Sequence, residues 1–191
     1  TMADMRDPAS YEAAIQPNTK LLYIETLTNP VLKVCDISAM AEVAKRHNLL
    51  LLIDNTFASP WGCQPLVLGA DLVIHSTTKY LGGHSDIIGG AVVGPKDLIA
   101  QIFMRKVHFG GSPDPHACYL LERGMRTLDV RMPRICENAA TLAERLEQHD
   151  AIEIVYHTSL ESHPDFEVAK RTMPKGSGMV AFIVKGGDEA A

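Results

Sequence analysis

The chain has 191 residues, 46% of them hydrophobic, so it is long enough to bury one substantial core. Its net charge is −5 and its lysines and arginines are scattered, which argues against a nucleic-acid-binding surface. No apolar run approaches the length of a membrane span, we identify no signal segment, and the four cysteines show neither C-x-x-C nor zinc-type spacing. We therefore expect a cytoplasmic protein with reduced cysteines and no metal site.

Two apolar segments, residues 21–24 and 49–53, are predicted to be parallel strands, because continuous apolar runs are typical of strands covered on both faces. A helix is predicted between them at residues 36–47. Asp36 suits its N-cap, and apolar residues recur along it at helical spacing. Strand, helix and strand at this length form a βαβ unit, whose strands run in the same direction.

Polar side chains follow each of three predicted strands. Glu25 and Asn29 follow the first, and Asp54 follows the second. Lys79 follows a third apolar segment at residues 72–74. Because ligands of open α/β sheets bind at the carboxyl ends of the strands, we expect one cleft to collect these groups.

Lys79 is the first candidate for chemistry. A lysine that leaves a buried strand among small hydroxyl residues and glycines is expected to be desolvated, and its amine then attacks carbonyls to form a Schiff base. The alternative is a surface lysine in a strand-to-loop turn. The segment alone gives the two interpretations equal weight.

The strand ends together match the needs of pyridoxal 5'-phosphate. Its aldehyde requires a lysine, its ring nitrogen an anion, its phenolic oxygen a donor and its phosphate hydroxyls. We assign Asp54 to the ring nitrogen, because it ends the most apolar strand, where an unpaired carboxylate would be costly. Ser76 and Thr78 alternate along the third strand end, so both hydroxyls are expected to face the phosphate.

Several ordered motifs resemble the sulfur amino-acid family of pyridoxal-phosphate enzymes, which includes cystathionine γ-synthase, cystathionine γ- and β-lyases, methionine γ-lyase and O-acylhomoserine sulfhydrylases. The motifs are residues 25–30, 54–57 with 59–60, 76–80, 83–86 and 123–128. The resemblance implies an α/β, aspartate-aminotransferase-like (fold type I) large domain with a mostly parallel sheet. It also implies a small α+β C-terminal domain, of which this chain holds only the start.

The resemblance also implies a role for each candidate residue. Lys79 would be the Schiff-base lysine and Asp54 the pyridinium partner. Ser76 and Thr78 would bind the phosphate. Asn29 and Glu25 would lie near the phenolic oxygen and the substrate-carboxylate side of the ring.

Family members are considerably longer than this chain, so we expect an internal piece of a longer protein that lacks the N-terminal part of the fold. By the resemblance, the parts outside it supply a ring-stacking tyrosine, a phosphate-binding glycine turn and the arginine that binds the substrate carboxylate. A tyrosine and an arginine reach into the neighbouring subunit's site, which implies a homo-oligomer, a dimer of dimers. We expect these residues alone to bind the cofactor poorly.

Beyond Lys79 the pattern predicts a strand at 87–94, a helix with Pro95 at its N1 position, and a helix at 113–122 closed by Gly124. Apolar residues then recur every three or four positions. They predict a long amphipathic helix at about 128–149, with Pro133 as a kink or as its true beginning.

In the family, that helix links the large domain to the small one. We place the boundary near His149, which gives a partial large domain at 1–149 and the beginning of the small domain at 150–191. Strands are predicted at 152–156 and 179–184. Residues 162–165 are interpreted as a surface loop, so His163 receives no catalytic role.

Two other histidines are interpreted structurally. His75 should point away from the face that carries Ser76, and we expect a packed core histidine. His84 and Asp86 are interpreted as groups that fix the glycine-rich loop.

The family implies elimination or replacement at the γ-carbon of an amino acid, in which C–S bonds break or form. Residues 54–57 and 83–86 favour a cystathionine γ-lyase or γ-synthase, with methionine γ-lyase, cystathionine β-lyase and O-acylhomoserine sulfhydrylase as alternatives. Two other classes stay open. One is an aldolase-like lysine enzyme without the cofactor, and the other is a catalytically silent binding or assembly module, against which the joint presence of Lys79 and Asp54 argues.

Overall fold

The computed structural model describes residues 1–187; residues 188–191, the end of the predicted small domain, lie outside the described residues. In chain order the elements are α1 (Pro8–Ala14), β1 (Leu21–Glu25), α2 (Ile37–Arg46), β2 (Leu50–Asp54), α3 (Ser59–Gly62), β3 (Leu72–Ser76), β4 (Gly90–Val93), α4 (Lys96–Phe109), α5 (Pro115–Met125), α6 (Leu128–Glu147), β5 (Ile152–Tyr156), α7 (Phe166–Thr172) and β6 (Ala181–Val184). A wide helical turn, Thr77–Leu81, with non-helical backbone at Lys79, follows β3 and is called the lysine turn below.

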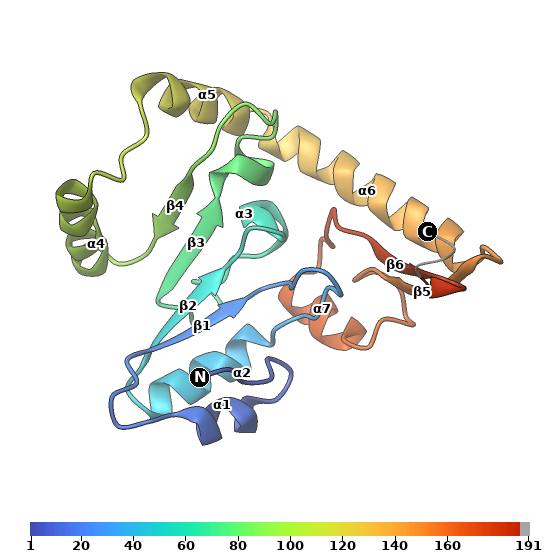
Figure 1. The fold of residues 1–191 in the computed structure, drawn as a ribbon, viewed down its shortest axis with the longest axis horizontal. Helices are drawn as coiled ribbons and strands as arrows, with labels where there is room; N and C mark the ends of the chain where they lie inside the picture. Colours follow the sequence, from blue (N-terminus) through green and yellow to red (C-terminus); the bar gives the residue numbers. More distant parts are fainter. Residues whose placement is uncertain (188–191) are drawn as a thin grey trace.

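The main sheet has the strand order β1-β2-β3-β4 (Figure 1). β1, β2 and β3 are parallel, which confirms the predicted βαβ unit, whereas β4 runs antiparallel to β3. The strand predicted at 87–94 is shorter than expected. Its first residues form a loop instead, in which the carbonyl of Gly89 accepts a hydrogen bond from the N–H of Thr77.

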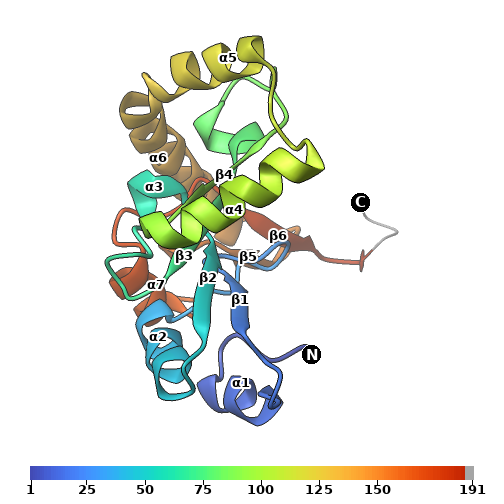
Figure 2. The same cartoon turned by 90° about the vertical axis from the view of Figure 1, so that its left-hand side faces the viewer.

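One face of β1 and β2 is buried and the other is largely open. The side chains of the buried face pack on α2 and α7, which lie on the same side of these strands (Figure 2). The open face carries Tyr23, which is 49% exposed, and Glu25 and Asp54, which are half-buried. The alternation of a strand thus separates core residues from strand-end polar residues.

α2 forms where its sequence predicted it. The Asp36 side chain accepts a hydrogen bond from the N–H of Ala39, which satisfies one of the free donors at the helix start. Lys45 and Arg46 lie in the last turn, where positive charge suits the helix dipole. α2 also supplies four buried residues to the core: Ile37, Met40, Val43 and Ala44.

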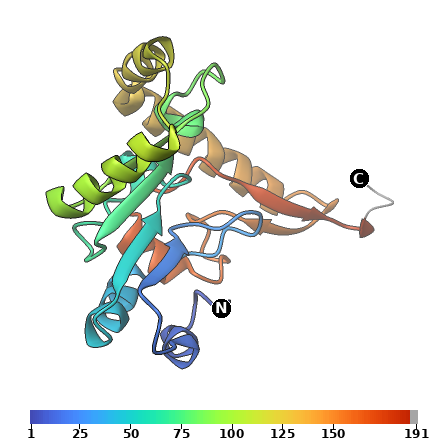
Figure 3. The same ribbon diagram turned by 60° about the vertical axis from the view of Figure 1, so that its left-hand side comes forward.

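α6 confirms the predicted long helix and carries the chain away from the main sheet. It begins at Leu128 with Pro133 inside it, so Pro133 does not mark its beginning. β5 and β6 pair antiparallel, and Ala143 of α6 packs with Val155 and Leu160 in a second core cluster. Figure 3 shows α6 and the β5–β6 pair extending together from the main sheet. Within residues 1–187, none of the helices is both long and apolar enough to cross a lipid bilayer.

The ends of two helices differ from the predictions. Pro95 is the N-cap residue of α4, which begins at Lys96. α5 begins at Pro115, after Asp114 caps it by accepting hydrogen bonds from two backbone N–H groups. Gly124 lies inside α5 and is buried. The expectation that it ends the helix is therefore wrong.

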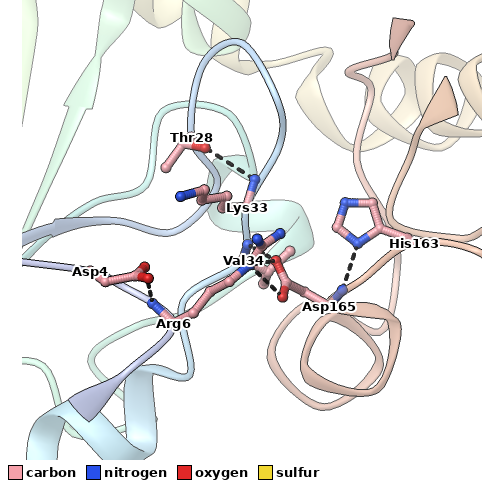
Figure 4. Close-up of polar contacts among 7 residues, drawn as sticks. All are labelled: Asp4, Arg6, Thr28, Lys33, Val34, His163 and Asp165. Atoms are coloured by element: carbon pink, nitrogen blue, oxygen red, sulfur yellow. Dashed lines mark hydrogen bonds and ion pairs between the residues drawn. The ribbon is translucent and has the colours of Figure 1, made fainter. Parts of the chain in front are cut away.

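The segment at residues 162–165 is a loop, as expected, with Ser162 and Pro164 exposed, but its other two side chains are buried. His163 is 3% exposed and Asp165 is 7% exposed. Asp165 accepts hydrogen bonds from Nε of Arg6 at 2.9 Å and from the N–H of Val34 at 3.0 Å (Figure 4). Nδ1 of His163 accepts the N–H of Asp165 at 3.0 Å. The Asp165 side chain is buried because it contacts two segments that precede β2.

α7 joins the same core. Its Ala169 and the following Met173 are buried in the cluster that lies against β1 and β2. The C-terminal segment therefore shares a core with the main sheet in addition to its own cluster under α6. The domain boundary near His149 stays a prediction.

Candidate functional site

The carboxyl ends of β1, β2 and β3 meet at one edge of the sheet. Glu25 lies opposite Asp54 in the β1–β2 register, and Asp54 lies opposite Ile74 of β3. β3 ends two residues later at Ser76, directly before the lysine turn. Glu25, Asp54 and Ser76 thus lie together at the carboxyl edge of the sheet, where the sequence predicted them.

Thr56 links two of these strand ends. Its hydroxyl donates to Oδ1 of Asp54 at 2.6 Å and accepts the N–H of Ser76 at 2.8 Å. Its own N–H also donates to Asp54, at 3.0 Å, in the local turn that aspartate often forms with the residue two positions on. Thr56 therefore fixes the position of the Asp54 carboxylate relative to Ser76, which directly precedes the lysine turn.

Tyr23 supports Asp54 from β1. Its hydroxyl donates to Oδ2 of Asp54 at 3.1 Å. Burial, together with the charge of Asp54, raises the pKa of Tyr23 to about 12, so the phenol remains a donor at neutral pH. Neither Tyr23 nor Thr56 was predicted from the sequence to belong to the site. The available signal was their position, two residues before Glu25 and two residues after Asp54.

Glu25 and Asn29 lie close together at the end of β1. Partial burial and the neighbouring Asp54 raise the pKa of Glu25, and an N–H of Asn29 opposes that rise. Asn29 itself is exposed. The structure thus places Asn29 in the same polar group as Glu25.

By the β2–β3 register, His75 lies on the strand face opposite to that of Asp54, as expected. It is buried at 7% exposure, and burial lowers its pKa against the opposing effect of the Asp54 charge. A neutral ring in the core is consistent with a packing role.

The lysine turn corrects two expectations. Lys79 is exposed in this chain, so the predicted desolvation of its amine is wrong here, because the turn carries the side chain out of the core. Thr78 does not continue β3, because the strand ends at Ser76. Its Oγ1 accepts the N–H of Gly89 at 3.0 Å, so strand alternation does not determine which way it faces.

The residues at this edge retain bonding capacity for a ligand. Within residues 1–187 the Ser76 hydroxyl has no hydrogen-bond partner, and Oδ2 of Asp54 accepts only from Tyr23. A carboxylate offers about four lone-pair sites, so Asp54 can still accept a ring N–H. An exposed amine, a free hydroxyl and a carboxylate at one sheet edge fit an aldehyde, a phosphate and a protonated pyridine nitrogen, the groups of pyridoxal phosphate.

Comparison with known proteins supports this interpretation. The family model described as Cys/Met metabolism PLP-dependent enzyme matches residues 1–191. The L-methionine gamma-lyase of Porphyromonas gingivalis is 48% identical over 193 residues, which cover 100% of this chain and 48% of that protein. The cystathionine gamma-lyase of Bacillus subtilis is 45% identical over 185 residues, which cover 96% of this chain and 49% of that protein.

The fold agrees with these relatives. The crystal structure of cystathionine gamma-lyase from Lactobacillus plantarum complexed with L-serine matches with a TM-score of 0.95 at 44% identity, over 97% of this chain and 49% of that chain. The chain thus spans about half the length of the relatives it matches. Its architecture is a partial fold type I α/β fold of the pyridoxal-phosphate-dependent enzymes. The chain belongs to the Cys/Met metabolism PLP-dependent enzyme family.

Proposed function

We propose that the intact protein catalyses pyridoxal-phosphate-dependent elimination or replacement at the γ-carbon of a sulfur amino acid. The convergence of Asp54, Ser76 and the lysine turn at one sheet edge carries this proposal. The names of its relatives, methionine and cystathionine gamma-lyases, support the substrate class.

Each strand-end residue receives a role in binding the cofactor. Lys79 binds the aldehyde, and Asp54 accepts the ring N–H. Ser76 and Thr78 donate to the phosphate. Asn29 donates to the phenolic oxygen. The paired donors Thr56 and Tyr23 keep the Asp54 carboxylate in one orientation.

The bound cofactor supplies an electron sink for negative charge at the substrate α-carbon. Lys79, once its amine is free, takes the α-proton, because an exposed side chain on a fixed turn can reach a bound substrate. Glu25 lies on the substrate side of the site. Its raised pKa keeps a larger fraction of its carboxyl protonated in mildly acidic solution.

Oligomeric state and location are part of the same proposal. The exposure of Lys79 in this chain supports a site that is completed by other parts of the protein and by a neighbouring subunit. We expect a cytoplasmic homo-oligomer, a dimer of dimers, whose remaining residues include the ring-stacking tyrosine and the arginine for the substrate carboxylate.

Cystathionine γ-lyase or γ-synthase is the reaction that we favour, because of residues 54–57 and 83–86. Methionine γ-lyase, cystathionine β-lyase and O-acylhomoserine sulfhydrylase are the alternatives. Product analysis with cystathionine, methionine and acylated homoserines distinguishes them. An α-keto acid with ammonia indicates elimination, and a new thioether indicates replacement.

The test of the cofactor lysine is Lys79→Ala in the intact protein. We expect loss of the visible absorbance of the Schiff base and of turnover, because no other amine stands at this turn. Lys96→Ala, at the exposed start of α4, is the matched control and should change neither. A yellow, active Lys79→Ala protein would refute the proposed function.

A further inference from the structure

We infer that Arg131 is a positioning residue for Lys79. Its side chain binds the backbone of the lysine turn at Tyr80 and so holds that turn in place. The inference rests on the proposed function, because it concerns the placement of the Schiff-base lysine. Arg131 lies near the start of α6, far from Lys79 in sequence. None of the sequence motifs that pointed to the site includes it.

The Arg131 guanidinium joins three segments of the chain. Its Nη2 donates to the carbonyl of Tyr80 at 3.0 Å and to the carbonyl of Gly124 at 2.9 Å. Its Nε donates to the hydroxyl of Thr127 at 3.0 Å. Tyr80 directly follows Lys79 in the lysine turn, so one hydrogen bond ends next to the reactive residue.

Close packing shows how tightly the guanidinium lies against this backbone. A Cβ added to Gly83, which follows the turn, would stand 2.3 Å from Nη1 of Arg131. Gly83 also has a φ of +75°, a conformation that side chains disfavour. A side chain at this point would therefore displace the Arg131 guanidinium from its observed position.

The rest of the turn is held by its own backbone. The N–H of Gly83 donates to the carbonyl of Lys79 at 2.8 Å, and the N–H of Gly82 donates to the carbonyl of Thr77 at 2.8 Å. Because the Lys79 side chain is exposed, the position of its backbone decides where its amine can reach. The link from Tyr80 to α5 and α6 through Arg131 anchors that backbone to the body of the protein.

The hydrogen-bond partners of Arg131 indicate that it acts through the directions of its hydrogen bonds and not through an ion pair. Within residues 1–187 no carboxylate lies within ion-pair distance of it, and all three acceptors are neutral oxygens. A planar guanidinium can donate to three acceptors in fixed directions, whereas a lysine ammonium is a compact charge on a flexible stem. Arg131→Lys should therefore keep the charge and lose the fixed geometry.

The experiment compares Arg131→Lys with Arg134→Lys in the intact protein. Arg134 lies on the same helix, but its side chain is 71% exposed and pairs with Glu137, so it is the matched control. For Arg131→Lys we expect kcat to fall by about tenfold to a hundredfold with a much smaller change in KM, because a displacement of about 1 Å at a reacting group costs that much. The pH midpoint of the Schiff-base absorbance should also shift.

A second readout does not depend on the cofactor. In cofactor-free protein, amide hydrogen exchange across residues 77–83 should be faster in Arg131→Lys than in the wild type and unchanged in Arg134→Lys. A lower melting temperature with normal kcat, absorbance and exchange across the turn would overturn the inference, because it would show a stabilising role only.

Two further variants keep the inference testable. If Arg131→Lys does not fold, Thr127→Val removes the acceptor of Nε and should produce a smaller change of the same kind; a wild-type profile in Thr127→Val would overturn the inference. Lys79→Ala separates the two proposals. A Lys79→Ala protein that stays yellow and active refutes the proposed function. If Lys79→Ala is inactive but Arg131→Lys behaves like the wild type, only the role of Arg131 is refuted.

Discussion

Asp54, which we propose as the partner of the cofactor's ring nitrogen, is held by its neighbours at the end of β2. It is half-buried, and hydroxyls from Tyr23 and Thr56 hold its two oxygens in place. Hydrogen bonds to a charged acceptor are stronger than neutral ones, so the carboxylate keeps one orientation. A fixed carboxylate at this position can stabilise a positive charge on a ring nitrogen without a change in its own orientation.

Replacement of Asp54 by asparagine in the intact protein tests this role. We expect the cofactor to remain bound, because Lys79 and the proposed phosphate ligands Ser76 and Thr78 are unchanged. We expect turnover to fall by about a hundredfold or more, because a preorganised charge at the reacting group is lost. Absorbance spectra and steady-state kinetics measure the two effects, and a near-normal rate would remove Asp54 from its role.

At the scale of elements, α5 determines where the lysine turn lies. Gly124 sits inside α5 with the backbone of Gly82 directly against it, and an added Cβ would stand 2.2 Å from the Gly82 carbonyl oxygen. A glycine inside a helix costs about 1 kcal/mol relative to alanine, so its presence here reflects close approach of two backbones. The helix could not pack at this distance with any side chain at that position.

Gly124→Ala should therefore destabilise the intact protein although alanine favours helices. We expect a loss of about 1–3 kcal/mol, since the neighbouring atom is backbone and cannot move aside easily. Gly111→Ala is the control, because a Cβ there meets nothing within 4 Å. Denaturant unfolding of both variants measures the difference, and equal stabilities would contradict the packing argument.

At the scale of the whole molecule, the Arg6–Asp165 ion pair joins the first residues of the chain to the segment before α7. The side chain of Asp165 is 8% exposed and that of Arg6 is 34% exposed, so the pair is partly screened by solvent. The N–H of Val34 donates to the same carboxylate, which connects the segment before α2 as well. Three parts of the chain thus meet at one buried acid.

Asp165→Asn should weaken this junction while it preserves the shape of the side chain. We expect the intact protein to lose about 1.5–3 kcal/mol of stability, the range for hydrogen bonds to charged groups. The exposed Arg134–Glu137 pair provides the comparison, and Glu137→Gln should have little or no effect. Thermal unfolding distinguishes the two variants, and a similar small change in both would show that the buried acid does not stabilise the fold.

Local patterns in the sequence were sufficient for the elements that carry the site. The apolar runs before Glu25, Asp54 and Ser76 predicted the parallel strands, and the N-cap at Asp36 predicted the start of α2. These features depend on residues within one or two turns of each other, and the direction of parallel strands then places their polar ends at the same edge.

Only the tertiary structure decided the exposure of Lys79, the burial of Asp165, and the place of Gly124 inside α5. The tertiary structure also decided that the hydroxyls of Tyr23 and Thr56 donate to Asp54 and that the Arg131 guanidinium binds the lysine turn. Each of these depends on which distant segments come into contact, and spacing along the chain does not encode that. The sequence by itself therefore determined which groups gather at the sheet edge, while packing between remote segments determined how each group is held.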